Sequence, residues 1–353
     1  MQCITPMFRR YEVGNHKKGT VVSRNEVLQE LIYDPNYIRY CLDGMNTYSR
    51  LNNGRYLYEQ IPCGHCYACK LNYAAQWSGR IMMECSEHDH NYFITLTYNE
   101  ENLPIPSTAE YDGVIYENDG TWNGTLMPEE MTKFIHDLRQ YEERKYHHTG
   151  IKYFYAGEYG SINKRPHYHM ILMNCPLDLN QFYDFDIDER GKTHWKSKEI
   201  EKFWNKGFVD VAEVEFASAA YVARYCMKKI TDLPDKKEYY EQGKKPEFVR
   251  MSRRPGIGMH YLEENMEEIY KYDAITLKNF HGETITVKPS KSWDKKMEKI
   301  HPDWMEKIKQ SRKKAAERSR RLLQEITDAT DAQQLLMQAE NINKKSNMLP
   351  REI

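Results

Sequence analysis

The segment "KRPHYHMILMN", Lys164 to Asn174, places two histidines one residue apart in an otherwise apolar run. Side chains of a β-strand alternate between its two faces, so His167 and His169 leave one face of such a strand while Tyr168 leaves the other. Two imidazoles on a face that should be apolar are the first indication of a functional site.

The preceding segment, "IKYFYAGEYG" (residues 151–160), is a second strand pattern, joined to the first by a short polar loop. Closing a hairpin through that loop sets Glu158 opposite His167 and Ala156 opposite His169. Opposed residues have Cβ atoms about 5 Å apart, so a carboxylate and two imidazoles converge. This donor set suits magnesium, manganese or zinc and leaves positions open for substrate oxygens. Two histidines hydrogen-bonded in a half-buried sheet are the alternative that the spacing leaves open.

A second motif is "AAYVARYCMKKI", residues 219–230. On a helix, Tyr221, Tyr225 and Lys228 form one stripe with Arg224 beside it, and the apolar residues lie on the opposite side. Two phenols and two cations can then face a cleft. A cation near a phenol favours its phenolate, and a metal near a phosphodiester withdraws charge from phosphorus, so the two motifs together supply nucleophile and electrophile. Taken alone, this helix is equally an amphipathic helix with surface tyrosines.

Hydrophobic periodicity predicts further elements. Helices are expected over residues 68–87, 127–144, 198–204 and 218–230, and strands over residues 91–99, 151–160, 165–174 and 207–214. In the strand 91–99, Phe93, Thr95 and Thr97 share one face. The order of elements favours an α+β fold, with an antiparallel sheet backed by helices, over a parallel doubly wound sheet.

We divide the chain into four parts. Residues 1–62 are expected to form an irregular N-terminal arm or insertion, 63–235 the core, 236–292 an extension of the core, and 293–353 a long polar helical tail. Residues 99–126, rich in Pro, Asn and Gly, are expected to be a surface insertion. The tail carries eight Lys/Arg between Lys307 and Arg321, which favours a solvated helix or coiled-coil arm first and a nucleic-acid contact second.

The composition limits the partners. With 51 Lys+Arg against 52 Asp+Glu, the 353 residues have a formal net charge of -1, so any nucleic-acid contact must be local. The N-terminus lacks the apolar run of a secretory signal, and no segment approaches the ~20 apolar residues that span a bilayer. We therefore expect an intracellular protein without a membrane partner. The 27 tyrosines suit nucleobases and phosphates, but equally half-buried sheets.

Cysteines form a third motif. Cys63, Cys66 and Cys69 follow the pattern CxxCxxC, which suits structural zinc. We assign Cys3 as the fourth ligand and keep Cys85 and His65 as alternatives. Reduced thiols at the start of a helix are the other interpretation. An iron–sulfur cluster of the bacterial ferredoxin kind would need a further cysteine at the position of Tyr73 and is disfavoured.

Single strands of DNA are held by basic grooves with aromatic platforms. The segment "VRMSRRPGIG" (residues 249–258) and the N-terminal arginine pair are candidates for phosphate contacts, although each could be a solvated charged loop. The candidate residues are Arg224, Arg250, Arg253, Arg254, Arg9 and Arg10.

The motifs "RPHYHMIL" and "YVARYCMKK" resemble the histidine and two-tyrosine motifs of the HUH endonuclease superfamily. The second is especially similar to that of rolling-circle replication initiators of microviruses, which are small single-stranded DNA bacteriophages. The segment "FITLTY" matches the first motif of those initiators, and "CGHCYACK" with "FVRMSRRPGIG" resembles patterns of the gokushovirus branch. The resemblance covers roughly Cys63 to Gly258, with the motifs in the family's order.

The resemblance implies an HUH endonuclease fold, whose antiparallel sheet is like that of RNA-recognition domains. It assigns His167 and His169, with Glu158 at a position that the family varies, as ligands of Mg²⁺ or Mn²⁺. Tyr221 and Tyr225 match the nucleophile pair, of which one leaves a 5′-phosphotyrosine and a free 3′-OH while the other acts at termination. Lys228, three residues after Tyr225, is expected to assist the tyrosine or the phosphate.

The expected function is therefore to nick single-stranded DNA at a phage origin and to rejoin the displaced strand, in the cytoplasm of a bacterial host. The expected partners are single-stranded DNA and the origin of the replicative form, with a host helicase or polymerase docking on the tail. A plasmid relaxase or transposase of the same superfamily is a neighbouring alternative, disfavoured by the spacing of the tyrosines and the absence of a helicase or long mobilisation domain. A non-catalytic zinc-containing nucleic-acid-binding protein is the alternative from another class.

Overall fold

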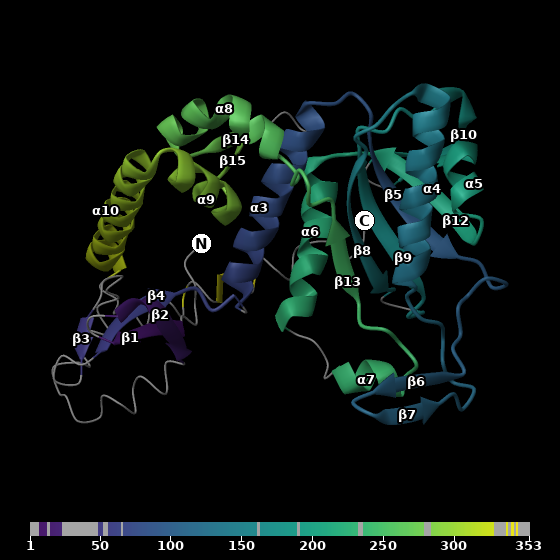
Figure 1. Cartoon of the computed structure of the whole chain (residues 1–353), viewed down its shortest axis with the longest axis horizontal. Helices are drawn as coiled ribbons and strands as arrows, with labels where there is room; N and C mark the ends of the chain where they lie inside the picture. The colour runs from purple at the N-terminus through teal and green to yellow at the C-terminus, as the bar shows by residue number, and fades with distance from the viewer. Residues whose placement is uncertain are drawn as a thin grey trace. The chain divides into compact units, whose positions relative to one another are not determined.

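The structure is a computed structural model (Figure 1). It describes residues 7–12, 15–22, 49–51, 56–64, 66–160, 163–188, 191–231, 236–278 and 284–327, together with positions 337, 340, 341 and 344. The chain divides into two compact units, Ala74–Trp293 and Met1–Tyr73 with Asp294–Ile353. Each unit is considered by itself.

The unit Ala74–Trp293 is built on a seven-stranded sheet with the order β10-β11-β12-β5-β9-β8-β13. All its neighbouring strands are antiparallel, which confirms the expected α+β class. The strands are β5 (Asn91–Tyr98), β8 (Lys152–Tyr159), β9 (Pro166–Met173), β10 (Phe182–Ile187), β11 (Thr193–Ser197), β12 (Gly207–Glu213) and β13 (Phe248–Met251).

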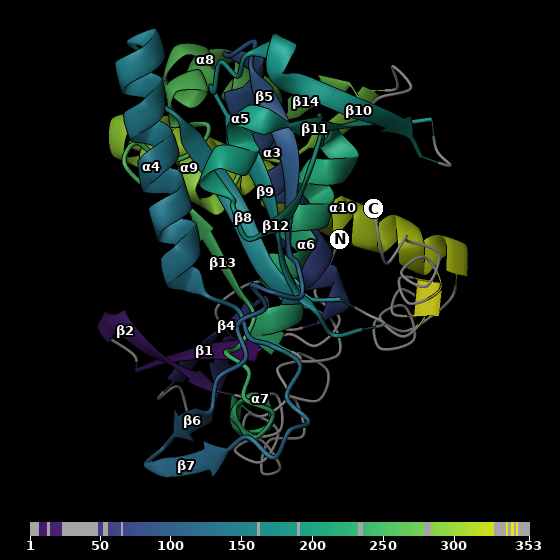
Figure 2. The same cartoon turned by 90° about the vertical axis from the view of Figure 1, so that its right-hand side faces the viewer.

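The helices of this unit are α4 (Pro128–Tyr146), α5 (Lys198–Phe203), α6 (Phe216–Thr231), α7 (Lys236–Glu241) and α8 (Met259–Tyr272). The helix α3 (Tyr67–Ser86) begins before the unit boundary. The elements β5, α4, β8, β9, α5 and β12 follow one another as β-α-β-β-α-β, the ferredoxin-like order. Because this order pairs β5 with both β9 and β12, the histidine strand lies in the middle of the sheet (Figure 2).

One face of the sheet forms the apolar core. Ile94 and Leu96 of β5 and Met170 and Leu172 of β9 are fully buried there, against α4 and α5. Figure 1 shows these two helices on one side of the sheet and α6 on the other. Alternation along the strands therefore sends Thr95, His167 and His169 to the face that α6 contacts.

The first long helix after β5 follows the expected start signals. α4 has proline in its first turn with Glu129 and Glu130, and it ends where His147 takes a left-handed conformation with φ of 51°. The phenol of Tyr98 donates to Glu130 (2.7 Å), and the amide N–H of Met127 donates to the phenol of Tyr168 (2.7 Å). These bonds attach the start of α4 to β5 and β9.

Several short elements were not anticipated. The expected surface insertion contains a hairpin of β6 (Thr108–Tyr111) and β7 (Val114–Glu117). A 3-10 helix η1 (Leu179–Gln181) precedes β10, and β14 (Ile275–Lys278) pairs with β15 (Thr284–Val287). These segments are short and partly polar, so their periodicity is weak.

The other unit contains a four-stranded antiparallel sheet with the order β2-β1-β4-β3. Its strands are β1 (Met7–Glu12), β2 (Asn15–Val22), β3 (Ser49–Leu51) and β4 (Tyr56–Ile61). The sequence led us to expect irregular structure here, because charged residues such as Arg9 and Arg10 interrupt any apolar alternation. The four predicted domain boundaries themselves stay predictions.

The C-terminal region is helical as expected, but it is divided. α9 (Lys291–Ile300) ends one residue before α10 (Pro302–Thr327) begins. Proline lacks an amide hydrogen and disfavours helical backbone in the residue before it, so Pro302 starts a new helix. Arg312 of α10 donates to both carboxylate oxygens of Asp294 (2.8 and 3.0 Å), which holds the two helices together.

A buried acid lies between α4 and α5. Glu142 is 0% exposed, and within the described residues neither of its carboxylate oxygens has a hydrogen-bond partner. Burial raises the pKa of Glu142 to about 7, and the nearby charge of Glu199 adds to this effect. Glu199, in contrast, accepts hydrogen bonds from Lys145 (2.9 Å) and Tyr146 (3.0 Å).

We expect Glu142 to make stability depend on pH. Since its pKa is higher in the folded than in the unfolded chain, its stabilising contribution is present below about pH 4.5 and is lost as the pH rises through about 7. Glu142→Gln should therefore gain stability relative to the wild type, on the order of 2 kcal/mol, between about pH 5 and about pH 8. Urea denaturation across this range measures the difference. The exposed neighbour variant Glu143→Gln should show no such slope; equal slopes for the two variants would contradict the assignment.

Candidate metal and nucleophile site

The hairpin β8–β9 has the register that the sequence predicted. Glu158 pairs with His167, and Ala156 pairs with His169. Nε2 of His167 lies 3.0 Å and Nε2 of His169 2.9 Å from the same oxygen, Oε1 of Glu158. The ligand atoms of these three residues all lie within 4.8 Å of one another. The three predicted metal ligands are thus brought together.

The second ring nitrogens of the histidines are also engaged. Nδ1 of His167 lies 3.0 Å from the carbonyl oxygen of Arg165, and Nδ1 of His169 lies 3.0 Å from the hydroxyl of Thr95. A carbonyl oxygen only accepts, so Nδ1 of His167 carries a proton. Its Nε2 then faces Oε1 of Glu158, and two acceptor atoms at this distance require a proton or a cation between them. Such backing of the far nitrogen is typical of histidines that bind metals.

The cluster is buried and charged. Glu158 is 3% exposed and His169 is 5% exposed. Burial would raise the pKa of Glu158, but hydrogen bonds from the two imidazoles hold it at about 2. Burial likewise opposes a charge on His167, yet the hydrogen bond to Glu158 raises the pKa of His167, whereas burial lowers the pKa of His169. A permanent negative charge therefore lies among nitrogen donors, which favours a cation at this point.

Two aromatic rings flank His169. The ring of Phe93 stacks on it, with centroids 5.6 Å apart and planes at 11°, and the ring of Tyr221 meets it edge-on, with centroids 5.2 Å apart and planes at 83°. Tyr221 is 4% exposed. The sequence led us to expect this phenol in an open cleft opposite the apolar side of the helix. In the structure, Tyr221 and the neighbouring Val222 and Ala223 are all buried, because α6 packs on β8, β9 and β13.

The remaining helix residues are only partly described. Arg224, Tyr225 and Lys228 lie in the helical backbone of α6, and their side chains are outside the described residues. Their helical spacing from Tyr221 is as predicted. Their chemical roles stay predictions.

The predicted DNA-binding arginines do not gather at the cluster. Arg250 pairs with Tyr155, so its side chain leaves the face of the sheet opposite to Glu158. There its guanidinium donates to Thr132 of α4 (3.2 Å). Arg253 and Arg254 are exposed in the turn that follows β13. The side chains of Arg9 and Arg10, like Cys3 and His65 as a whole, lie outside the described residues.

The predicted cysteine ligands are brought together in part. Cys63, Cys66 and Cys69 place their sulfur atoms within 4.8 Å of one another. Cys85 lies 16 residues after Cys69 on the same helix, α3. At about 1.5 Å per residue this is about 24 Å, which excludes Cys85 as a fourth ligand.

Sequence reasoning missed residues that support the cluster. Thr95 was placed on the correct face of its strand, but only the pairing of β5 with β9 sets it opposite His169. On the other side of Thr95, β12 contributes Asp210, whose carboxylate lies 2.7 Å from Nδ1 of His194. Alternation in the strands was the available signal, and the partner strand was the missing information.

The comparisons with known proteins converge on one family. The family model that matches describes the replication-associated protein ORF2, and it covers residues 91–230, from the first residue of β5 to the end of α6. The "Replication-associated protein ORF2" of Spiroplasma virus 4 is 36% identical over 323 residues, which cover 90% of this chain and 88% of that protein. The "Replication-associated protein VP4" of Bdellovibrio phage phiMH2K is 29% identical over 265 residues, 73% of this chain and 75% of that protein.

A more distant relative, the "Replication-associated protein ORF4" of Chlamydia phage 1, is 25% identical over 226 residues, 62% of this chain and 50% of that protein. No solved structure matches the chain. Among the described residues, no helix is both long and apolar enough to cross a bilayer.

We expect the Glu158 carboxylate to stabilise the fold. Glu158→Gln keeps the size of the side chain but removes the charge that the two buried imidazoles share, so stability should fall by about 1–3 kcal/mol. Urea denaturation at neutral pH with a chelator measures the loss. Glu100→Gln, which breaks an ion pair of the 82%-exposed Glu100 side chain with Arg165, is the control and should cost less than about 1 kcal/mol. A loss at Glu158 no greater than at Glu100 would contradict this account of the cluster.

Proposed function

The chain belongs to the family of the replication-associated protein ORF2, and we propose that it initiates rolling-circle replication of a phage genome by nicking single-stranded DNA at the origin. One observation carries the proposal. The ring of Tyr221 lies 5.2 Å from the ring of His169, whose Nε2 is 2.9 Å from Glu158. A phenol beside a carboxylate and two imidazoles is the combination that metal-dependent strand transfer by tyrosine requires. The resemblance to the HUH superfamily supports the same chemistry.

The proposed reaction exchanges one phosphodiester for another. The phenolic oxygen of Tyr221 or Tyr225 attacks the phosphorus, the bond from phosphorus to O3′ breaks, and O3′ takes up a proton as the phenol loses one. The products are a 5′-phosphotyrosine and a free 3′-OH. Because the energy of the ester bond is retained, attack by a 3′-OH on the phosphotyrosine can close a displaced strand without ATP. Two tyrosines on one helix allow one to cut while the other is occupied.

The residues present fit a divalent cation. Glu158, His167 and His169 would hold it, since the protonated Nδ1 of His167 leaves a lone pair on Nε2 directed at a buried carboxylate. When bound, Mg²⁺ or Mn²⁺ withdraws charge from the scissile phosphate. The chain's own contribution is to fix both imidazoles: Arg165 holds one through its carbonyl, and Thr95 holds the other through its hydroxyl.

Two other functions remain as outcomes of the tests. A relaxase or transposase would also form a phosphotyrosine, but on an origin of transfer or a transposon end rather than on the viral origin. A non-catalytic nucleic-acid-binding protein would bind DNA without forming any adduct. The match to a replication-associated protein over 88% of that protein's length favours replication initiation.

The nucleophile assignment predicts a covalent adduct. Wild-type protein, Mn²⁺ and single-stranded viral origin DNA labelled at its 3′ end should give a labelled protein band on a denaturing gel. The double variant Tyr221→Phe, Tyr225→Phe should lose the band by more than about a hundredfold, because phenylalanine keeps the rings but removes both hydroxyls. Tyr272→Phe, at a 67%-exposed position, is the matched control and should behave as wild type. An undiminished adduct in the double variant would refute the assignment.

The metal assignment predicts selective loss of Mn²⁺ binding. Titration calorimetry without DNA should show one Mn²⁺ bound by wild type and binding lost in His167→Ala and in His169→Ala. Thr95→Val should weaken binding by about tenfold, because it removes the oxygen that orients His169. His136→Ala, exposed on α4 at the opposite face of the sheet, is the control and should leave the affinity unchanged. Equal affinities in all variants would place the metal elsewhere.

A further inference from the structure

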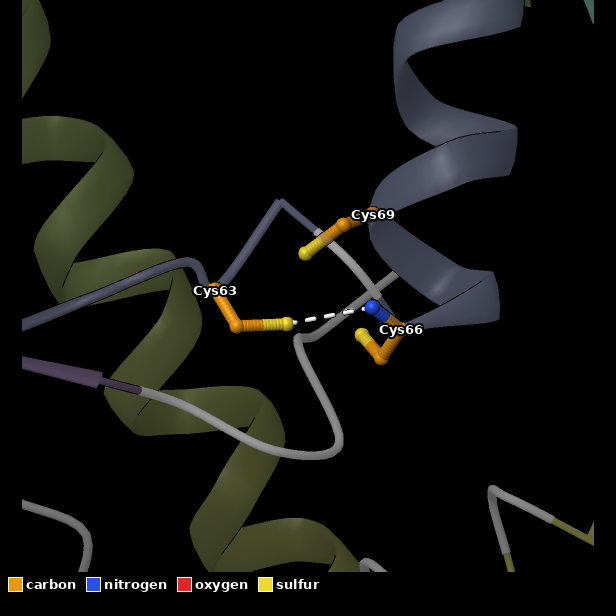
Figure 3. A group of neighbouring side chains, drawn as sticks. All are labelled: Cys63, Cys66 and Cys69. Atoms are coloured by element: carbon orange, nitrogen blue, oxygen red, sulfur yellow. Dashed lines mark hydrogen bonds between the residues drawn. The ribbon is translucent and has the colours of Figure 1, made fainter. Parts of the chain in front are cut away.

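Three thiols meet where β4 leads into α3. Cys63 follows the strand by two residues, Cys66 immediately precedes the helix, and Cys69 lies in its first turn. Their sulfur atoms all lie within 4.8 Å of one another. Figure 3 shows the three side chains converging on a common space between the incoming segment and the helix. None of these residues contributes to the proposed nicking site.

The local backbone builds this arrangement. Gly64 has φ of +77°, in the left-handed region that glycine favours, and it turns the chain directly after Cys63. The amide N–H of Cys66 donates to Sγ of Cys63 (3.1 Å) (Figure 3), and the amide N–H of Lys70 donates to the carbonyl oxygen of Cys66 (3.0 Å). The three-residue spacing of Cys66 and Cys69 then places both on one side of the helix start.

The environment favours thiolates. An amide N–H directed at a sulfur atom stabilises negative charge on it, and so does the positive end of a helix dipole. The first turn of α3 contains no acidic residue that would oppose this effect. Three thiolates at such short separations repel one another, however, unless a cation lies among them.

We propose that Cys63, Cys66 and Cys69 bind a structural zinc ion. Sulfur donors select zinc over Mg²⁺ or Mn²⁺, which prefer oxygen. A disulfide could use only two of the three thiols. Zinc is tetrahedral, so one further donor completes the site; Cys85 is excluded by its distance along α3, and the other candidates from the sequence, Cys3 and His65, lie outside the described residues. On binding, each thiol gives up its proton to solvent.

The consequence of the site is structural. The zinc ion would join the end of β4 to the first turn of α3 at a place where the chain reverses through only a few residues. Ala68, between the second and third ligands, is fully buried, so the helix start is fixed on both sides. Because the ligands differ from those proposed for nicking, either proposal can fail without the other.

Metal content tests the proposal directly. Full-length protein purified from cells without added metal should contain one zinc ion per chain by mass spectrometry of the metals. Cys63→Ser, Cys66→Ser and Cys69→Ser should each lose it. Cys85→Ser is the matched control on the same helix and should retain it. His169→Ala should also retain it, which separates this zinc from any ion at the Glu158 cluster.

Cobalt replacement covers the case in which a serine variant fails to fold. Exchange of the zinc in wild-type protein for Co²⁺ should give strong sulfur-to-cobalt absorption in the near ultraviolet and the visible bands of a tetrahedral ion, unchanged in Cys85→Ser and His169→Ala. Wild-type protein that holds no zinc and gives no sulfur-to-cobalt absorption would overturn the proposal, as would iron in place of zinc or a disulfide among these cysteines.

Discussion

The pairing of β9 with β8 on one side and β5 on the other is the constraint on which the candidate site depends. It sets Glu158 opposite His167 and Thr95 opposite His169. A shift of one residue in either pairing would turn the imidazoles toward the apolar core. The core side prevents this shift, because Met170 and Leu172 are fully buried and would have to move to the other face.

The same constraint explains why buried charge is tolerated in the middle of a sheet. A buried carboxylate is strongly unfavourable unless it is paired and hydrogen-bonded. Glu158 receives two imidazole contacts at one oxygen, and each imidazole is held at its far nitrogen by an oxygen of a neighbouring residue. Glu142 is the contrasting case in the same unit: it is buried without such partners among the described residues, and burial raises its pKa.

Two different donor sets occur in the chain. Glu158, His167 and His169 offer nitrogen and oxygen, whereas Cys63, Cys66 and Cys69 offer sulfur. Ligand type separates metals more reliably than affinity alone, so the two sets can hold different ions in the same cell. A rigid, sulfur-bound ion suits a structural junction, and a nitrogen–oxygen set with open positions suits an exchangeable phosphate.

The sequence by itself determined the local features: the alternation that puts both histidines on one face, the hairpin that opposes Glu158 to His167, and the helix that carries Tyr221. These follow from contacts between residues close in the chain. Only the tertiary structure decided that Thr95 supports His169, that Arg250 leaves the opposite face, and that the tyrosine helix buries its phenol against the sheet. Those outcomes depend on which strands pair and on which face a helix packs, and such choices are made by the summed burial of residues far apart in the chain rather than by any local pattern.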